Sequence, residues 1–559
     1  MSRRVIAAFF LALCLHATAW SAPLASVPQA LFVPLDDRPS TLLFVRQIAR
    51  IGGGWLRVPE RAWLGSGLTP GQPERIIAWL DAGGDKKCDT AIMSADMVAY
   101  GGLVASRNAA TPLETARRRL DVFDRLRRPG LHTEVFTIIP RLSLRTSARQ
   151  APYERRLAQW ATEPAAPPPS DVPPDVTEEY LGVRRRNLAV ILDLIDRAAA
   201  GRIDRLVIGQ DDSAGTGLHA EDQRRIREAI AQRRLGTRVV LLSGADELGM
   251  DMASGWLARR YGWAPAISVV YDRPEAAQEI PPLESLPLED AVRAHLSLAG
   301  ATLRNDGDPL PVDLFIRTPL EKPYDLPPPS AALSADALAH RIRASILNGH
   351  PTALADLALI NMADPYLARA VIHGVPLPNL EGYAAWNTPS NKLGTVIAQI
   401  VSHRLAERFG ATWPRGRVVD SERAHQAFLL ARLVDDYRYQ AIVRAKVRPR
   451  TAGLSPDADP LLNLFGPVGL EIRLELLRYA TRLFDRRFRG SSVWVPGLRQ
   501  WAVLERATET CVLPWRRLFE VELGVDVRIA AHKLPVSRPR PGNLGPEPLP
   551  TEGPSRESH

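Results

Sequence analysis

Residues 205–223, RLVIGQDDSAGTGLHAEDQ, combine a short apolar run, a turn that contains two glycines and a polar stretch suited to begin a helix. The apolar run is typical of a strand that is buried on both faces. Two adjacent carboxylates, Asp211 and Asp212, fall where this strand should end. The stretch therefore predicts one strand–turn–helix unit of an α/β fold, with its acids at the carboxyl end of the strand.

The same alternation recurs from about residue 30 to residue 410. Candidate strands are ALFVPL (30–35), DTAIMS (89–94), EVFTIIP (134–140), RLVIG (205–209), RVVLLS (238–243), AISVVY (266–271), VDLFIR (312–317) and LADLALI (354–360). Amphipathic helical stretches separate most of them, for example 73–83, 113–128, 178–201, 221–234 and 247–262. Buried strands joined by helical crossovers predict an α/β fold with one or more mostly parallel sheets, either open or closed into a barrel.

Composition shifts divide the chain into segments. We expect a first α/β domain over 28–245 with a proline-rich insertion at 162–176, and a second α/β domain over 246–420. A mainly helical accessory region should follow at 421–535. Residues 536–559 hold too few apolar side chains to fold and are expected to form a disordered tail.

The N-terminus has the features of a secretory signal. A basic start, MSRR, precedes the apolar segment 5–20, and small residues at 17, 19 and 21 offer a cleavage site. We therefore expect residues 1–21 to be a signal peptide and the protein to be exported to the periplasm or the extracellular space. No later apolar run is long enough to predict a stable membrane span.

The distribution of charge argues against one class of binding partner, and the number of cysteines limits the possible disulfides. The 559 residues carry a formal net charge of +9, but the arginines are scattered among acids without a dense basic block, which argues against nucleic acid as a partner. Beyond the signal peptide, the cysteines are Cys88 and Cys511. They could form one bridge in an oxidising compartment or remain two buried thiols.

Ligands of parallel α/β sheets bind beyond the carboxyl ends of the strands, so the polar residues at those positions are the candidate site. As catalytic residues we predict Asp37, Asp96, Asp212 and Glu247. As substrate-binding residues we predict Asp36, Arg38, Tyr100, Arg107, Arg141, Gln210, Asp211, Asp246, Asp364, Trp386, Asn387 and Asn391. Each acid has an alternative structural explanation, because an aspartate before a helix is often an N-cap and Asp-Pro often a turn.

Within this set, position along the strand suggests roles. Asp212, or Asp37 across the cleft, is the predicted base or nucleophile, whereas Asp211 should orient Arg38 or cap the following helix. Glu247 is the predicted general acid, because burial and repulsion from a neighbouring aspartate would raise its pKa. The pair LDDRP (35–39) and VYDRP (270–274) shares a tripeptide, which is too short a repeat to establish a duplication.

Two other interpretations of residues 205–223 agree less well with the sequence. GTGLHA (215–220) matches a dinucleotide loop, but the pyrophosphate would lie against two carboxylates. DDSAG (211–215) lacks the first glycine of a nucleophile turn, so Ser213 is better explained as a cap or turn hydroxyl. The histidines show no zinc-binding spacing, which predicts no metal and no cofactor, although Mg²⁺ or Ca²⁺ on oxygen ligands stays open.

Export, clustered acids, amides and a tryptophan together suit a sugar, whose hydroxyls need many partners and whose apolar face stacks on rings. The sequence predicts a hydrolase that acts on a carbohydrate or cell-envelope glycan. The alternative is a non-catalytic binding protein for a polar ligand. Two free carboxylates about 5–5.5 Å or 6.5–9.5 Å apart would favour glycoside hydrolysis. Acids that are each held by an arginine would favour binding or a structural role.

Several short motifs also resemble, in order, those of a bacterial family known as domain of unknown function (DUF) 4127. They are PLDDRP (34–39), SADMVAYGGLVASR (94–107), IIPRLS (138–143), GQDDSAGTG (209–217), GADELG (244–249), LADLALINMAD (354–364), GYAAWNTPSNKLGT (382–395), LVDDYRYQAIVR (433–444) and LPWRRLFEV (513–521). The resemblance covers roughly residues 30–525 and implies no activity. It does imply that the strand-end residues form one constellation.

Overall fold

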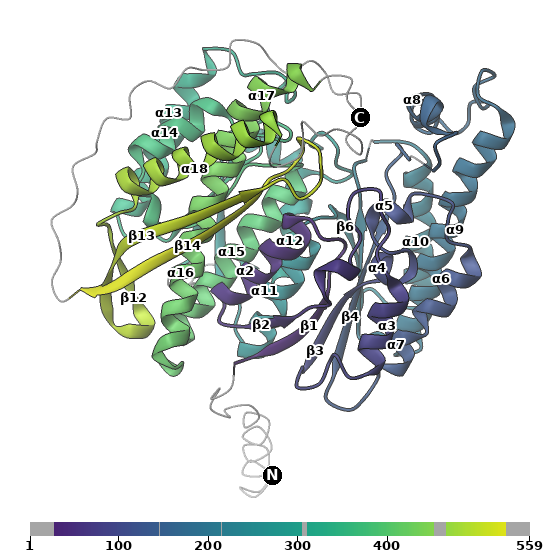
Figure 1. Cartoon of the computed structure of the whole chain (residues 1–559), viewed down its shortest axis with the longest axis horizontal. Coiled ribbons are helices and arrows are strands. Elements are labelled where there is room, and N and C mark those ends of the chain that lie inside the picture. Colours follow the sequence, from purple (N-terminus) through teal and green to yellow (C-terminus); the bar gives the residue numbers. More distant parts are fainter. Residues whose placement is uncertain (1–26, 145, 214, 305–309, 452–465, 533–559) are drawn as a thin grey trace, which may run out of the picture.

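The computed structural model describes residues 27–144, 146–213, 215–304, 310–451 and 466–532. They form two parallel sheets wrapped by helices and one antiparallel sheet near the C-terminus (Figure 1). The predicted α/β fold with parallel sheets is confirmed. The predicted signal peptide and the predicted tail lie outside the described residues.

The first sheet contains six parallel strands in the order β2-β1-β3-β4-β5-β6. Their bounds are β1 (Gln29–Val33), β2 (Trp55–Arg57), β3 (Thr90–Ser94), β4 (His132–Ile139), β5 (Arg205–Gln210) and β6 (Val239–Ser243). The predicted strand at 205–209 is β5, which lies between β4 and β6 and is almost wholly buried. Its carboxyl end carries Asp211 and Asp212 to the edge of the sheet.

The second sheet contains five parallel strands in the order β11-β10-β9-β7-β8. Their bounds are β7 (Ala266–Tyr271), β8 (Thr302–Leu303), β9 (Val312–Arg317), β10 (Thr352–Asp356) and β11 (Leu380–Ala384). In both sheets the first strand therefore lies between the second and the third. The repeated Asp-Arg-Pro follows the first strand of each sheet, β1 and β7.

Helices cover the sheets and fill the space between them (Figure 1). Around the first sheet they are α2 (Phe44–Ile51), α3 (Pro73–Asp81), α4 (Ala95–Tyr100), α5 (Leu103–Ser106), α6 (Leu113–Leu120), α7 (Val122–Arg125), α8 (Glu154–Trp160), α9 (Pro174–Ala199) and α10 (Leu218–Gln232). Around the second they are α11 (Leu248–Tyr261), α12 (Leu288–Ala299), α13 (Ala331–Leu347), α14 (Pro365–Gly374) and α15 (Pro389–Phe409). Buried side chains of α2, α11 and α15, such as Ile48, Leu257 and Ile397, belong to one core that also contains residues of both sheets.

The C-terminal region is helical only in its first part. It contains α16 (Arg415–Arg432), the π-helix η7 (Leu433–Val443), α17 (Arg444–Val447) and α18 (Pro467–Arg487), as the prediction for 421–535 required. An antiparallel sheet of β12 (Ser492–Val495), β13 (Gln500–Val512) and β14 (Glu522–His532) then follows, and the helical prediction omitted it. The long strand β13 alternates buried and charged residues because α18 packs on one of its faces.

The predicted proline-rich insertion at 162–176 is partly helical. Residues 162–173 connect α8 to α9, but α9 begins at Pro174. Proline is tolerated there because the first N–H groups of a helix have no partner within the helix.

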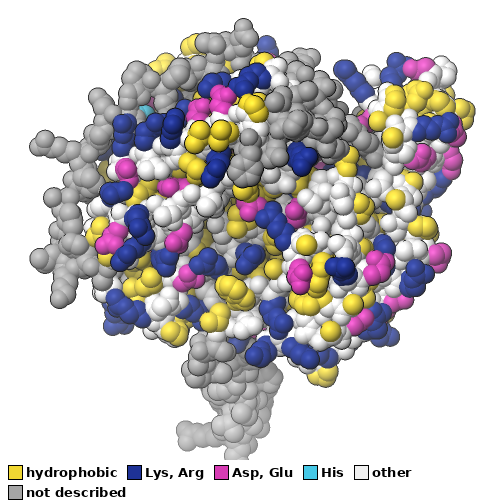
Figure 2. All heavy atoms as spheres, in the orientation of Figure 1, with side chains coloured by type: hydrophobic (Ala, Val, Ile, Leu, Met, Phe, Trp, Pro, Cys, Tyr) yellow, Lys and Arg dark blue, Asp and Glu magenta, His cyan; other side chains and the backbone are white. Residues whose placement is uncertain are grey.

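Three further observations bear on the sequence predictions. Cys88 and Cys511 are both buried and unbridged, which matches the second of the two possibilities for them. Among the described residues, no helix combines the length and the apolar character that crossing a membrane requires. Figure 2 shows basic and acidic side chains intermixed over the face in view.

Candidate functional site

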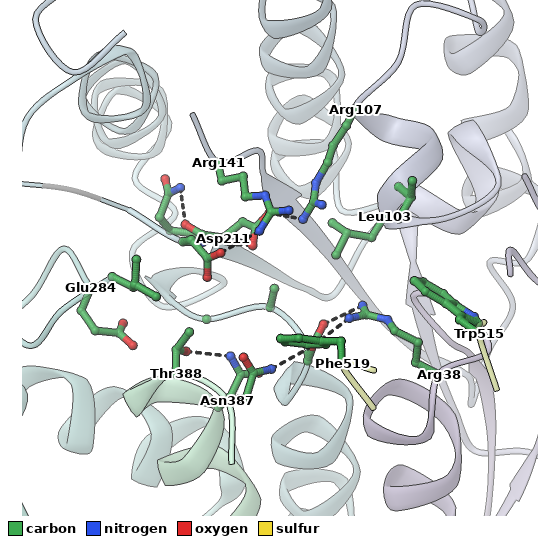
Figure 3. A pocket seen from close by; sticks show the side chains of 18 of the residues that line it. Arg38, Leu103, Arg107, Arg141, Asp211, Glu284, Asn387, Thr388, Trp515 and Phe519 are labelled. Atoms are coloured by element: carbon green, nitrogen blue, oxygen red, sulfur yellow. Dashed lines mark hydrogen bonds and ion pairs between the residues drawn. The ribbon is translucent and has the colours of Figure 1, made fainter. Parts of the chain in front are cut away.

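A cavity of about 200 Å³ lies where the carboxyl ends of the first sheet face the second domain (Figure 3). Predicted site residues in its lining are Arg38, Arg107, Arg141, Gln210, Asp211, Asp212, Asp246, Asn387 and Asn391. The lining also includes Leu103, Val104, Gly244, Ala245, Leu283, Glu284, Thr388, Trp515, Arg517 and Phe519. These residues come from the carboxyl ends of strands in both sheets, from the loops and first helical turns that follow them, and from the loop between β13 and β14. We call this cavity the interdomain pocket.

Arg38 joins two aspartates at the base of the interdomain pocket. Its Nε donates to both carboxylate oxygens of Asp36 at 2.9 Å, and its Nη1 and Nη2 donate to Asp246 at 3.0 and 2.7 Å. All three side chains are buried. Burial alone would lower the pKa of Arg38, but the carboxylates of Asp246 and Asp36 raise it well above its usual value. The guanidinium is therefore a fixed cation that orients both acids.

The adjacent acids that follow β5, Asp211 and Asp212, are also held by arginines. Arg107 donates to Asp211 in a very short contact, and Arg141 Nη1 donates to Asp212 Oδ2 at 2.8 Å. Burial would raise the pKa of Asp211, but Arg107 and Arg141 together lower it. Asp211 thus stays ionised. Both predicted roles of Asp211 are wrong: Arg38 already has Asp36 and Asp246 as partners, and Gly217 is the N-cap of the following helix, α10.

Glu284 is an acid of the interdomain pocket that the sequence did not reveal. It belongs to the loop between β7 and α12, where no strand or helix pattern marks it. Its carboxylate accepts hydrogen bonds from the backbone N–H and the hydroxyl of Ser390, at 2.8 and 2.7 Å. Burial raises the pKa of Glu284 to about 7 despite these bonds. Among the described residues, no arginine forms an ion pair with it, so it differs from the aspartates of the pocket.

Two aromatic rings close one side of the interdomain pocket. Trp515 and Phe519 come from the loop between β13 and β14, and Figure 3 shows both beside Arg38. The indole N–H of Trp515 donates to Asp37 Oδ1 at 2.7 Å, and its ring lies 5.2 Å from the Arg38 guanidinium. The motif LPWRRLFEV (513–521) contained the only sequence signal for these rings, and no strand pattern pointed to it.

The predicted pair Asn387 and Asn391 does reach the interdomain pocket. Asn387 Nδ2 donates to Asp246 Oδ2 at 3.1 Å, and its backbone has a positive φ of 80°. Asparagine tolerates this left-handed conformation better than most residues, and such strain is frequent at functional sites. Asn391 Nδ2 donates to Thr388, whereas its buried Oδ1 has no hydrogen-bond partner among the described residues. That oxygen is a buried acceptor without a protein donor in the described part of the chain.

Three predicted residues lie just behind the pocket wall. Asp36 is covered by Arg38, and Asp37 is bonded to Trp515 with Arg61 3.6 Å away. Burial raises the pKa of Asp37. Trp386 packs against Phe519 with ring centroids 5.4 Å apart and lines a smaller cavity instead of the interdomain pocket.

The remaining predicted residues are directed elsewhere. Asp96 lies in the first turn of α4, where it accepts the backbone N–H of Ile138 at 3.0 Å, and burial raises its pKa to about 7. The ring of Tyr100 packs under the guanidinium of Arg186, 4.5 Å away. Asp364 caps α14 and pairs with Arg317. These side chains hold the fold together and do not line the interdomain pocket.

The position of Glu247 also differs from the one that its predicted role as a general acid requires. Burial and the nearby Asp251 raise its pKa, as expected, but the side chain is fully buried and folds back to accept the N–H of Ala245 at 3.1 Å. A glycine at 394 makes room for it, because a Cβ there would lie 2.4 Å from Glu247 Cγ. The prediction that four catalytic acids share one cleft therefore holds for Asp212 and is wrong for Asp96 and Glu247, while Asp37 is adjacent but covered.

The fold and its pocket define an α/β protein with two parallel sheets and a polar cavity between the carboxyl edge of one sheet and the loops of the other. The chain belongs to the family described as "Protein of unknown function (DUF4127)", whose model matches residues 30–524. The resemblance seen in the sequence motifs is thereby confirmed.

Other comparisons add little. No curated protein matches the chain at a significant level. A solved complex between 3,4-dichloroaniline and a UDP-glucosyltransferase from Polygonum tinctorium, which can glucosylate indoxyl, shares 11% sequence identity, with 73% of this chain and 95% of that chain covered. Its TM-score of 0.18 is too low to support an inference.

Proposed function

We propose that the interdomain pocket binds a carbohydrate or a similar ligand rich in hydroxyl groups, and that the protein is an exported binding protein. The observation that carries this proposal is that each aspartate of the pocket is held by an arginine. Asp246 pairs with Arg38, Asp211 with Arg107 and Asp212 with Arg141. Carboxylates fixed in this way suit ligand recognition, because they accept hydrogen bonds from hydroxyls without being free to attack a substrate.

The rest of the lining supports the same ligand class. Trp515 and Phe519 offer apolar ring surface beside polar groups, which is the combination that a sugar ring requires. The amide of Asn391 keeps an unused buried acceptor. Arginine planes and carboxylates alternate around the cavity, so donors and acceptors are both present for ligand hydroxyls.

Binding can be tested with the purified chain and a panel of sugars and envelope glycan fragments, measured by calorimetry. We expect at least one ligand of the panel to bind, and Trp515→Ala to weaken that binding by roughly threefold to tenfold, since loss of a stacking ring costs on the order of 0.5–1.5 kcal/mol. Trp494→Ala is the control, because Trp494 is a half-exposed tryptophan on β12 away from the pocket lining. Failure of the whole panel, or equal loss in both variants, would contradict the proposal.

Hydrolysis is a second candidate, favoured by one specific observation. Glu284 lines the pocket with a pKa near neutrality and without an arginine partner among the described residues, as a general acid requires. Asp212, whose side chain is 24% exposed, would be the base, and substrate binding would have to release it from Arg141. Turnover of aryl glycosides that disappears in Glu284→Gln while ligand binding persists would favour this candidate. Ligand binding by the wild type without any turnover would favour the first candidate, a binding protein, over a hydrolase.

Export is part of the proposal and rests on residues 1–21 alone. It is tested by expressing the full chain in a bacterium and measuring the mass of the protein recovered from the periplasm or medium. We expect a product shortened near residue 21. An uncleaved chain confined to the cytoplasm would contradict export.

A further inference from the structure

A group of ionisable side chains lies between the second sheet and the helical C-terminal region, outside the interdomain pocket. It comes from the start of β11, from the middle of α15 and from α16, and we call it the α15 cluster. Its members are Glu381, His403, Arg404, Glu407, Glu422 and His425. Glu381 lies at the beginning of β11, whereas the pocket residues of this segment follow the end of that strand. The cluster is therefore separate from the candidate ligand site.

The geometry of the cluster brings three potential metal ligands together. His403 and Glu407 are one helical turn apart on α15, so they project from the same face. Together with Glu381 they offer three ligand atoms that all lie within 4.8 Å of one another. Ligand atoms about 2.0–2.2 Å from a common zinc-like ion are roughly 3–3.5 Å apart, so small side-chain movements would complete the coordination.

A second carboxylate contact helps to fix the histidine. His403 Nδ1 lies 2.8 Å from Glu381 Oε2, and His403 Nε2 lies 3.5 Å from Glu422 Oε2. His425 stacks on the His403 ring with centroids 3.7 Å apart and planes 7° from parallel. Its own Nε2 is bonded to the backbone oxygen of Leu380 at 3.0 Å. The ring of His403 is thus oriented by groups outside the three ligands, as in metal sites whose ligands are held by surrounding residues.

The balance of charge also suits a divalent cation. Glu381 and Glu407 share the guanidinium of Arg404, which approaches Glu381 through Oε1 and leaves Oε2 to His403, while Glu422 contacts the other nitrogen of that ring. With all three carboxylates ionised, the cluster carries two negative charges beyond the guanidinium, which a divalent ion bound to neutral His403 would neutralise. Without an ion, protons supply this compensation. Burial raises the pKa of Glu407 to about 7, and although burial alone would lower the pKa of His403, Glu381 raises it. Buried charges need such compensation, because unpaired ones are costly.

We propose that Glu381, His403 and Glu407 bind one divalent first-row transition-metal ion. Imidazole together with carboxylate ligands favours zinc, iron or manganese over calcium or magnesium. Because the ligands come from β11 and α15, and because Glu422 and His425 belong to α16, the ion would hold the helical C-terminal region against the second sheet. This site is independent of the ligand proposed for the interdomain pocket.

The test uses the full chain, first freed of metal with a chelator and then titrated with Zn²⁺ by calorimetry and with Co²⁺ by absorption. We expect one ion per chain and a higher melting temperature with the ion bound. His403→Ala and Glu407→Gln should each weaken binding by more than about 100-fold, the upper end of what losing an outer partner of a metal ligand costs.

Glu475→Gln is the matched control. Like Glu407, Glu475 is a helical glutamate paired with an arginine. The side chain of Glu475 is 20% exposed and that of Glu407 is 22% exposed. We expect Glu475→Gln to bind metal like the wild type. If His403→Ala fails to fold, the partly exposed Glu407 still decides the matter. Absence of binding to the wild type, or binding by Glu407→Gln equal to that of Glu475→Gln, would overturn the proposal.

Discussion

The two α/β halves of the molecule use similar strand-end residues for different purposes. In the first half, Arg38 joins Asp36 to Asp246 and faces the interdomain pocket. In the second half, Arg317 joins Asp272 and Asp364, at 2.9 and 3.2 Å, but lies outside the pocket lining. An arginine between two aspartates is therefore not in itself a site. It becomes one where the edge of its sheet faces another domain across open space.

The repeated tripeptide makes the same point. After β1 the arginine of Asp-Arg-Pro is Arg38, which is buried between two acids. After β7 it is Arg273, whose side chain is 41% exposed and donates to Thr318 Oγ1 and to the backbone oxygen of Pro319. Equal sequence after topologically equivalent strands thus gives a pocket residue once and a loop anchor once.

The largest effects should come from removing the two buried arginines. Arg38→Ala leaves the buried Asp36 and Asp246 without their cation, and Arg317→Ala does the same to the buried Asp364 and the nearly buried Asp272. Each variant should lower the free energy of unfolding by roughly 3–5 kcal/mol, measured by urea denaturation. Only Arg38→Ala should also abolish binding of the pocket ligand. Equal loss of ligand binding in a folded Arg317→Ala protein would remove the distinction between the halves.

A medium effect is expected from pH, through Glu284. Burial raises its pKa from the ordinary 4.5 to about 7, so between these values the folded chain holds a proton that the unfolded chain has released. The free energy of unfolding should therefore fall as pH rises from 4.5 to 7, with Glu284 contributing up to about 3 kcal/mol of that fall. In Glu284→Gln this contribution should vanish. Urea denaturation of both proteins at pH 5 and pH 8 measures it, and parallel pH dependence would show that Glu284 does not titrate there.

The smallest effect should follow Arg273→Ala. Because this guanidinium is partly exposed, its ion pair and hydrogen bonds should contribute no more than about 1 kcal/mol to the free energy of unfolding. Ligand binding should stay unchanged. A loss comparable to that of Arg38→Ala would mean that the second tripeptide has a role beyond anchoring its loop.

Much of the fold could be predicted because long buried strands have a clear sequence signature. The strands missed in the parallel sheets are either very short, as β2 and β8 are, or interrupted by Glu381 and Gly382, as β11 is. The antiparallel sheet escaped notice because β13 is half exposed and carries many charged residues. Apolar runs reveal burial on both faces, whereas half-buried strands need a partner to be recognised.

The acids of the candidate site could be predicted best where a strand leads straight to its edge, whereas Asn387 and Asn391 were found from local sequence alone. Asp211 and Asp212 follow β5 directly and reach the pocket, whereas Asp96 follows β3 just as closely but is turned inward because α4 begins at once. The direction of a side chain after a strand depends on the next few dihedral angles, which the pattern does not specify. Glu284 and Trp515 belong to loops far along the chain, and only the folded chain brings them to the pocket.

The bond between Trp515 and Asp37 spans 478 positions of sequence. A chain made from its N-terminus forms the first sheet, with Asp37 at its edge, long before the loop that carries Trp515 exists. Contacts so distant in sequence are also slow to form, because the ends of a long segment must first meet. The pocket can therefore be completed only after the loop that carries Trp515 has been made. A nascent or truncated chain can have most of its secondary structure and still lack the wall that encloses a ligand, so ligand binding would report that synthesis and folding have both finished.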